Sequence, residues 1–437
     1  MRKNLFKKVL ALTLASTMAF SMAGCGSKGG SSDAKNDDGT ITLNVWHQWS
    51  NDTNELKGKY EEAVKAYEKE NTGVKIKTET LDTEAYKTKI NAEFAGDAKG
   101  IDVFYWWGAG TAKKLVDAGK VMALDDYVTD DVKSKILEGS TSAFEYDGKL
   151  YSVPMFSWYM TLFCNKTMFD KAGATLPTTY DELVDAVKKL KKLDGVIPMA
   201  AGAKDGWNAA FVYQALALRE VGATGVNEML SGKKEFGDEG FKKAAQKVSD
   251  LYEMGAFGDN PLEQGNDDAN AAFENGKAAM RLMGSWFANN VYTDDAATIK
   301  PEEVVALKIP TIADGKGEAT DYCGGFVESF WVNNNTKYKE EAAKFCIYIN
   351  EKMGVASYET GSGFSGWTTP ADESNLNPLF IQIKDLLAEG KQGVLAWDTS
   401  LESEPAAVHN EQVQTLFADG ADIDAFIDEH KAAINGK

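Results

Sequence analysis

Tryptophan carries the clearest chemical signal in this chain, because most of its ten copies fall where predicted strands end or beside glycine. An indole ring offers a flat apolar face and one N–H donor at its edge. Sugar rings present apolar C–H faces that lie well against such a surface. We therefore expect eight tryptophans to line a carbohydrate-binding cleft: Trp49, Trp106, Trp107, Trp158, Trp207, Trp286, Trp367 and Trp397.

Two polar residues accompany the indoles at the end of the first predicted strand. His47 and Gln48 stand directly before Trp49. Ligands of open α/β sheets bind outside the carboxyl ends of the strands, and polar side chains at that edge can bind equatorial hydroxyls. The neighbours Trp106 and Trp107 face opposite ways if both lie on a strand, so the sequence leaves open which one faces the cleft.

Strands and helices alternate along the chain. Apolar periodicity predicts strands over 41–46, 74–80 and 101–105, and helices over 56–67, 86–94 and 111–118. A second region predicts strands over 150–154, 160–164, 197–200, 281–283 and 326–332, and helices over 269–280 and 338–350. Thr179 and Glu182 form a capping box for a further helix. This alternation predicts an α/β fold built on parallel, doubly wound sheets.

Charge and composition narrow the kind of ligand. The chain has 437 residues and a net charge of −19, and its only arginines are Arg2, Arg219 and Arg281. Arginine is the preferred side chain for binding phosphate or carboxylate, and an acidic surface repels nucleic acid. We therefore expect a neutral ligand and no nucleic-acid partner.

The sequence contains no pattern typical of a metal or catalytic site. His47 has no partner at metal-ligand spacing, and Cys164, Cys323 and Cys346 lack such spacing as well. We expect the thiols of Cys164 and Cys346 to be buried, while a single disulfide among the three cysteines stays open. We predict no cofactor, no metal and no catalytic residue.

The N-terminus predicts where the protein works. A basic segment and a short apolar core precede Ala23-Gly24-Cys25, a pattern typical of a secretory signal over 1–24. The position of Cys25 resembles a lipobox, whose cysteine becomes diacylated, and two acyl chains anchor a protein stably. Residues 25–40 are rich in glycine, serine and charged residues and predict a flexible tether. An ordinary secretory signal is the alternative.

Several short motifs follow the lipobox in a set order: 41–46 (ITLNVW), 102–110 (DVFYWWGAG), 151–154 (YSVP) with Asn165-Lys166 after it, 273–280 (FENGKAAM), 284–286 (GSW), Gly324-Gly325 and the segment around Asp398. This order resembles the family 1 extracellular solute-binding proteins of carbohydrate ABC importers, relatives of maltose-binding protein. The resemblance runs from residue 41 to near the C-terminus. It implies a type II, periplasmic-binding-protein-like fold with two lobes and three crossings between them. The implied lobes are 41–157 with 327–374, and 158–326 with 375–437.

The resemblance also implies roles for single residues. Trp106 and Trp286 match the stacking aromatics of the family. Trp158 stands at the first crossing, where relatives often have a carboxylate. Glu328 follows the glycine pair and belongs either to the cleft or to the hinge. The remaining residues implied to line the cleft are His47, Gln48, Trp49, Trp207 and Asp398.

Together these features predict a monomeric receptor, anchored by lipid to the outer face of the cell membrane of a Gram-positive bacterium. It is expected to capture a neutral oligosaccharide, such as xylo-, cello- or manno-oligosaccharide, and to deliver it to ABC permease subunits. Contact with the membrane is expected only through the lipid. Two alternatives stay open: an extracellular glycoside hydrolase, which requires a pair of carboxylates, and a surface carbohydrate adhesin.

Overall fold

The computed structural model describes residues 39–51, 55–293 and 297–436, and these residues all belong to one compact unit. The predicted signal peptide, the lipidation site Cys25 and the predicted tether up to residue 38 lie outside the described residues. None of the helices that the structure describes is long and apolar enough to cross a membrane.

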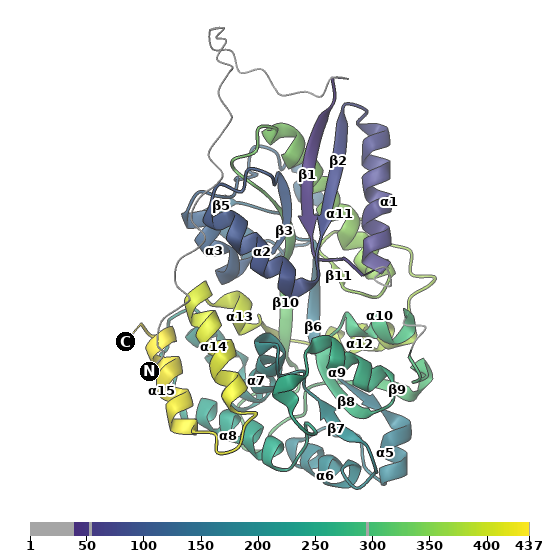
Figure 1. The fold of residues 1–437 in the computed structure, drawn as a ribbon, viewed down its shortest axis with the longest axis vertical. Coiled ribbons are helices and arrows are strands. Elements are labelled where there is room, and N and C mark those ends of the chain that lie inside the picture. Colours follow the sequence, from purple (N-terminus) through teal and green to yellow (C-terminus); the bar gives the residue numbers. More distant parts are fainter. Residues whose placement is uncertain (1–38, 52–54, 294–296, 437) are drawn as a thin grey trace, which may run out of the picture. The chain divides into compact units, whose positions relative to one another are not determined.

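A mixed sheet is the main scaffold of the described residues (Figure 1). Its main path has the order β2-β1-β3-β10-β6-β8-β7, while β9, β11 and β12 pair off that path. The strands are β1 (Ile41–His47), β2 (Val74–Thr80), β3 (Val103–Trp107), β6 (Phe156–Asn165), β7 (Ile197–Ala200), β8 (Ala278–Gly284), β9 (Val304–Leu307), β10 (Asp321–Val332), β11 (Phe364–Ser365) and β12 (Gln392–Val394). A separate hairpin consists of β4 (Glu145–Tyr146) and β5 (Lys149–Leu150).

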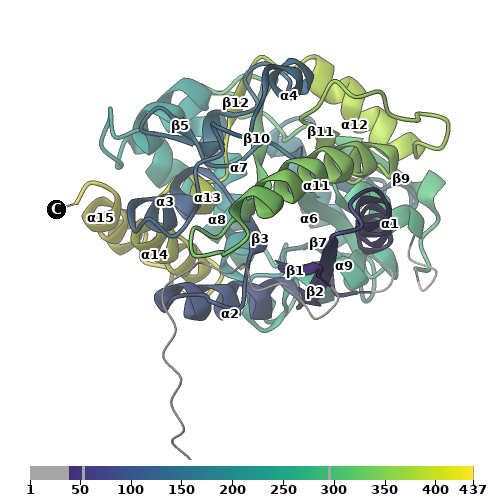
Figure 2. The same ribbon diagram turned by 90° about the horizontal axis from the view of Figure 1, so that it is seen from above.

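Helices surround this sheet (Figure 2). They are α1 (Glu55–Glu70), α2 (Thr83–Ala95), α3 (Ala109–Asp117), α4 (Asp130–Lys135), α5 (Lys166–Ala172), α6 (Tyr180–Leu190), α7 (Gly206–Leu230), α8 (Glu239–Glu253), α9 (Asn266–Glu274), α10 (Phe287–Thr293), α11 (Lys339–Glu359), α12 (Pro378–Ala388), α13 (Trp397–Ser400), α14 (Ser403–Thr415) and α15 (Ile423–Ile434). Short 3-10 turns occupy Ser142–Phe144, Pro261–Glu263 and Pro301–Glu303.

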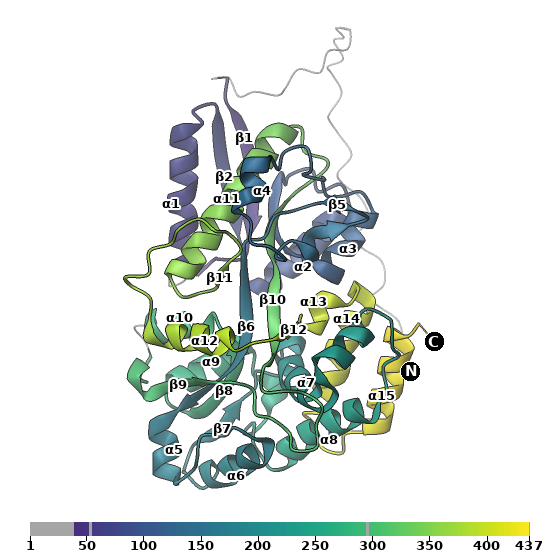
Figure 3. The same cartoon turned by 180° about the vertical axis from the view of Figure 1, so that it is seen from behind.

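The sheet is parallel toward its two ends and antiparallel in its middle. β1 runs parallel to β2 and β3, and β7 runs parallel to β8. β10 is antiparallel to β3 and to β6, and β6 is antiparallel to β8. The α/β class is confirmed, but the expected parallel pairing does not extend to these central strands. β6 carries the chain from the first half to the second and β10 carries it back, so these neighbours run in opposite directions (Figure 3).

The central strands β6 and β10 contribute buried residues to two separate hydrophobic cores. The N-terminal core contains buried residues from 41–156, 330–353 and Trp367, and the C-terminal core contains buried residues from 158–309, Cys323 and 379–427. In the first core α1 packs on α11, and in the second α7 packs on α8 and α14. On β6, Phe156 belongs to the N-terminal core and Trp158 to the C-terminal core. We therefore propose that each core is one lobe and that the first lobe boundary lies between these two residues.

Local capping explains where two important helices begin. The capping box expected from the sequence is confirmed, because Thr179 Oγ1 accepts from the N–H of Glu182 and the Glu182 carboxylate accepts from the N–H of Thr179. The carboxylate of Asp82 accepts from the N–H of Ala85 at 3.1 Å and starts α2. The cap of α2 matters for the site, because this helix contributes charged side chains to the cavity described below.

Two expected elements differ from the structure. The helix expected over 269–280 is wrong beyond Glu274, because Gly276 adopts a left-handed φ of 62° and the apolar run after it forms β8. The strand expected over 150–154 is wrong after Leu150, where β5 ends. In both places an apolar run has no periodicity strong enough to distinguish helix, strand and extended loop.

The three cysteines of the described residues are buried and free, so they form no disulfide with one another. The burial expected for Cys164 and Cys346 is confirmed. Burial also raises the pKa of Cys323 to about 12, which keeps this thiol protonated. Within the part of the chain that the structure describes, no group of three His, Cys, Asp or Glu side chains is placed to hold a metal ion.

Candidate ligand-binding site

A cavity of about 1130 Å³ is lined by residues of both cores. Ligand pockets of proteins typically measure roughly 300–1,000 Å³, so this one has room for more than one sugar ring. Nine of the twelve contact residues expected from the sequence line it, namely Gln48, Trp49, Trp106, Trp107, Trp158, Trp207, Trp286, Glu328 and Asp398. These residues come from distant parts of the chain, and the fold brings them together.

The C-terminal core supplies an aromatic wall. Trp158 on β6 stacks on Phe211 with ring centroids 5.3 Å apart and meets Trp286 edge-on at 5.0 Å. Trp207 is the second residue of α7, and its ring centroid lies 5.3 Å from that of Phe211, one turn later. Gly284 makes room for Trp286, since a Cβ at this position would lie 2.0 Å from the indole. This glycine explains the spacing of the Gly-Ser-Trp turn.

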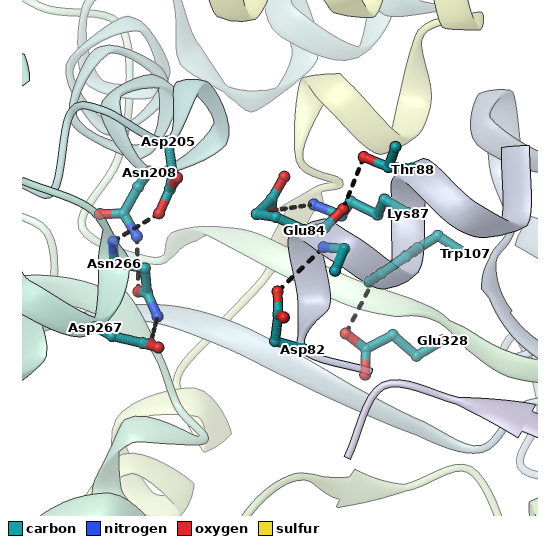
Figure 4. Close-up of polar contacts among 11 residues, drawn as sticks. Asp82, Glu84, Lys87, Thr88, Trp107, Asp205, Asn208, Asn266, Asp267 and Glu328 are labelled. Atoms are coloured by element: carbon teal, nitrogen blue, oxygen red, sulfur yellow. Dashed lines mark hydrogen bonds and ion pairs between the residues drawn. The ribbon is translucent and has the colours of Figure 1, made fainter. Parts of the chain in front are cut away.

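The N-terminal core supplies a second aromatic wall at the end of β3. The indoles of Trp106 and Trp107 lie 5.5 Å apart with their planes at 65°, and both line the cavity. The sequence left open which of the two faces the cleft, and in the fold both belong to the cavity lining. Trp107 Nε1 donates to the carboxylate of Glu328 at 3.3 Å (Figure 4), which joins β3 to β10 at the cavity wall.

Two carboxyl groups of the cavity hold a proton more tightly than usual. Burial raises the pKa of Glu328 to about 7, although its hydrogen bonds and the nearby charge of Lys87 act in the opposite direction. Burial also raises the pKa of Asp398, again partly opposed by Lys87. Near neutral pH, Glu328 is therefore able to donate as well as accept a hydrogen bond.

Lys87 on α2 lies close to the indoles of both walls. Its Nζ pairs with Glu84 at 3.1 Å (Figure 4) and lies 5.1 Å from the ring centroid of Trp107 and 5.7 Å from that of Trp207. A cation within about 6 Å of an indole face is attracted to it. Sequence reasoning missed Lys87. Helical periodicity places this lysine on a polar face of the helix, but it does not show that this face lines a cavity.

A polar cluster completes the C-terminal wall (Figure 4). Asn266 begins α9, and its N–H donates to the carboxylate of Asp205 at 2.6 Å. The amide of Asn208 donates to Asn266 Oδ1 at 2.9 Å, and the amide of Asn266 donates to Asp267 at 3.0 Å. Sequence reasoning singled out none of these residues, although the segment around Trp207 was expected near the cleft.

Four buried polar atoms of the cavity lining have no hydrogen-bond partner among the described residues: Trp106 Nε1, Trp207 Nε1, Gln48 Oε1 and Asn410 Oδ1. Most buried polar atoms in proteins have a partner. Donors and acceptors of this kind, in a lining that also contains aromatic rings, are suited to bind the hydroxyl groups of a ligand.

His47 was expected to contact the ligand, but it does not line the cavity, so it is left out of the contacts proposed below. Its ring is 1% exposed and lies 4.2 Å from the ring of Tyr60, and Nδ1 accepts from the N–H of Trp49 at 3.2 Å. Burial lowers its pKa to about 3, so it is neutral in the folded protein. As the last residue of β1, its side chain points to the core, whereas Gln48 lies beyond the strand.

Trp367 and Trp397 were also expected to contact the ligand, but neither lines the cavity, and they are left out of the proposed contacts as well. Trp367 packs in the N-terminal core and donates its indole N–H to the carbonyl of Pro154 at 2.7 Å. Trp397 is 1% exposed and stacks on His409 with ring centroids 4.9 Å apart. Both tryptophans follow loops. An indole packed beneath a loop can be as deeply buried as an indole on a strand.

The two cores meet directly beside the cavity, where α3 touches α13. Thr111 Oγ1 donates to the carbonyl of Asp398 at 3.3 Å. A Cβ at Gly110 would lie 2.3 Å from the carbonyl oxygen of Ser400 and 2.2 Å from that of Leu401. Only glycine permits this approach of the two backbones.

Known proteins resemble the chain in sequence and in fold. The family model described as bacterial extracellular solute-binding protein matches residues 50–355. A solved structure from work on xylan utilization by the thermophilic bacterium Caldanaerobius polysaccharolyticus is 36% identical. It superposes with a TM-score of 0.86 over 90% of this chain and 100% of that chain.

Two more distant relatives agree. A structure of CpMnBP1 with mannotriose bound is 21% identical, with a TM-score of 0.71 over 90% of this chain and 100% of that chain. The multiple sugar-binding protein of Streptococcus mutans is 23% identical over 368 residues, which are 81% of this chain and 80% of that protein. With these likenesses, the two-lobed α/β fold expected from the sequence is confirmed.

Proposed function

Because this chain belongs to the bacterial extracellular solute-binding proteins, we propose that it captures a neutral oligosaccharide and delivers it to an ABC importer. One observation carries the proposal: a cavity large enough for several sugar rings is walled by tryptophans from both cores. The apolar faces of successive sugars would stack on these indoles, and the polar atoms between them would bind hydroxyl groups.

The charge of the lining favours a neutral ligand. Even if Glu328 and Asp398, whose pKa values are raised, keep their protons, six further acidic residues outnumber three lysines in the lining: Asp82, Glu84, Asp205, Asp267, Asp268 and Glu274 against Lys87, Lys114 and Lys204. An acidic sugar would enter a field of its own sign and would lose its hydration without a matching arginine. We therefore propose discrimination against uronic acids.

Similar proteins support the class of sugar. One similar structure comes from work on xylan utilization, another holds mannotriose, and the Streptococcus relative is named a multiple sugar-binding protein. We propose a plant-glycan oligosaccharide of xylo-, cello- or manno- type for this chain. The proposed ligand contacts are the nine residues predicted from the sequence that also line the cavity.

The proposal includes location and partners. The family is extracellular, and we propose that Cys25 carries the lipid that holds the protein, as a monomer, at the outer face of a Gram-positive membrane. ABC permease subunits would receive the sugar. Metabolic labelling with a fatty acid tests the anchor, because Cys25→Ala should abolish the label while leaving the signal sequence otherwise intact.

Titration of the purified protein tests the ligand. Xylotriose, cellotriose and mannotriose are added while tryptophan fluorescence is followed, and calorimetry then gives the affinity of each, with glucuronic acid-substituted xylotriose as the charged comparison. We expect a saturable response to at least one neutral sugar and a weaker response to the charged one. No response to any neutral oligosaccharide would refute the proposal.

A second assay separates binding from hydrolysis. Glu328 and Asp398 are carboxyl groups with raised pKa in one cavity, the chemical feature that a glycoside hydrolase also needs. We propose that the sugar leaves unchanged. Steady release of new reducing ends from the oligosaccharide that binds best would favour the hydrolase instead.

A further inference from the structure

Arg281 on β8 lies behind the C-terminal wall of the cavity and does not line it. The side chain is 1% exposed. Its guanidinium donates to the backbone carbonyls of Ala200 and Ala201. It also donates to three asparagine carboxamides, at 2.8 Å to Asn208, 3.0 Å to Asn266 and 3.1 Å to Asn270. Two of these asparagines, Asn266 and Asn270, line the cavity.

The chemistry of arginine fixes how these amides are turned. A guanidinium carries only N–H donors, so each carboxamide that faces it presents its oxygen and turns its NH₂ group away. The hydrogen bonds beyond Arg281 agree with this orientation. Asn208 donates to Asn266 Oδ1, and Asn266 donates to the carboxylate of Asp267 (Figure 4). Arg281 thus sets one direction of donation for the whole cluster.

Asn270 differs from Asn208 and Asn266 in what its NH₂ group meets. Its Oδ1 is held by Arg281 Nε, and among the described residues no acceptor is hydrogen-bonded to its NH₂ group. The residue lines the cavity and is 7% exposed. Its NH₂ group is therefore a donor at the cavity wall, and the donor Trp207 Nε1 belongs to the same lining.

We infer that Arg281 is a positioning residue for ligand binding, which holds Asn270 so that its NH₂ group donates to an oxygen of the bound sugar. This inference rests on the proposed function and adds a residue that does not touch the ligand. Loss of the guanidinium would free the amide to flip, and the flipped amide would present an oxygen where the ligand needs a donor.

Arg219 provides a matched control in the same core. It is also 1% exposed, and its guanidinium donates to the backbone carbonyls of Ile309, Glu318 and Asp321. It lines no part of the large cavity. Both arginines stabilise buried carbonyl groups, but only Arg281 holds side chains of the cavity wall.

The test compares Arg281→Lys, Arg219→Lys, Asn270→Ala and the double variant Arg281→Lys/Asn270→Ala. Thermal unfolding reports stability, and calorimetry measures affinity for the trisaccharide that the wild type binds best among xylotriose, cellotriose and mannotriose. Both lysine variants are expected to lower the unfolding temperature. Arg281→Lys and Asn270→Ala should each weaken binding about five- to tenfold, the loss of one hydrogen bond, while Arg219→Lys stays within about twofold.

The double variant gives the decisive comparison. If Arg281 acts through Asn270, Arg281→Lys should weaken binding little further once Asn270 is alanine. The inference would be overturned if the loss of affinity in the double variant equalled the product of the losses in the two single variants. Wild-type affinity in a folded Arg281→Lys protein would also overturn it. Should Arg281→Lys fail to fold, unchanged affinity of Asn270→Ala overturns it alone. A wild type that binds none of the three sugars refutes the proposed function instead.

Discussion

Gly110→Ala should block the contact between α3 and α13 without harming either core. An added Cβ would lie 2.2 Å from the carbonyl oxygen of Leu401. Ordinary van der Waals contact begins near 3.4 Å. The two helices would therefore have to separate by about 1 Å, the difference between these two distances. Backbone atoms fill the position, so no side-chain rotation can relieve the clash.

The clash at Gly110→Ala should lower the affinity for the ligand. Overpacking of a close contact costs about 1–3 kcal/mol. Binding of sugar by both walls requires the two cores to be close together, so this cost should appear as weaker binding, by about 5- to 150-fold. Inside the helix itself, alanine is favoured over glycine by about 0.5–1 kcal/mol. Thermal stability should therefore fall little, or rise.

Calorimetry with the best-bound trisaccharide measures the affinity, and small-angle X-ray scattering with and without sugar measures compaction. Gly58→Ala is the matched control, because Gly58 lies in α1 of the same core and a Cβ added there would meet nothing within 4 Å. The control should bind like the wild type. Wild-type affinity and compaction in Gly110→Ala would refute the idea that this glycine permits the two cores to approach.

Three further predictions concern the walls and the buried ionisable groups. Trp106→Ala and Trp286→Ala should each weaken sugar binding by about 1–3 kcal/mol in calorimetry while unfolding stays cooperative, and unchanged affinity in both would exclude these indoles from the site. Because the pKa of Glu328 is raised from 4.5 to about 7, the folded protein keeps a proton that the unfolded chain releases, and stability falls as pH rises from 4.5 to 7. Glu328→Gln should remove up to about 3 kcal/mol of this fall in denaturant unfolding, and an identical pH slope would contradict the assignment. Because the pKa of His47 is lowered from 6.5 to about 3, the unfolded chain binds the proton first and stability is lost as pH falls below 6.5. His47→Asn should remove up to about 5 kcal/mol of that loss and leave sugar affinity unchanged, and weakened binding would show that His47 reaches the ligand after all.

Local patterns in the sequence were sufficient to predict most elements of the fold. The strand over 74–80 matches β2, and the strand over 197–200 matches β7. The capping box at Thr179 and Glu182 marked the start of α6. Side-chain periodicity and capping act within a few residues, so they can be read without knowing what the element packs against.

Pairing between distant strands was not predictable in the same way. The antiparallel pairing of β6 with β10 joins segments more than 150 residues apart, and nothing local to Phe156–Asn165 states the direction of its partner. The same limit affected the cysteines: an apolar neighbourhood predicted burial, whereas the sequence left open whether any of them pair, and in the fold all three are free.

By itself, the sequence determined that indoles would gather near strand ends and that acidic, arginine-poor composition suits a neutral ligand. Tertiary structure alone decided which indoles reach the cavity, turning Trp158 toward it and Trp397 into the core. It also decided the roles of Lys87 and Arg281, whose partners lie on other elements. The physical reason is that the type of a side chain sets what it can bind, while only the packing of the whole chain sets what it meets.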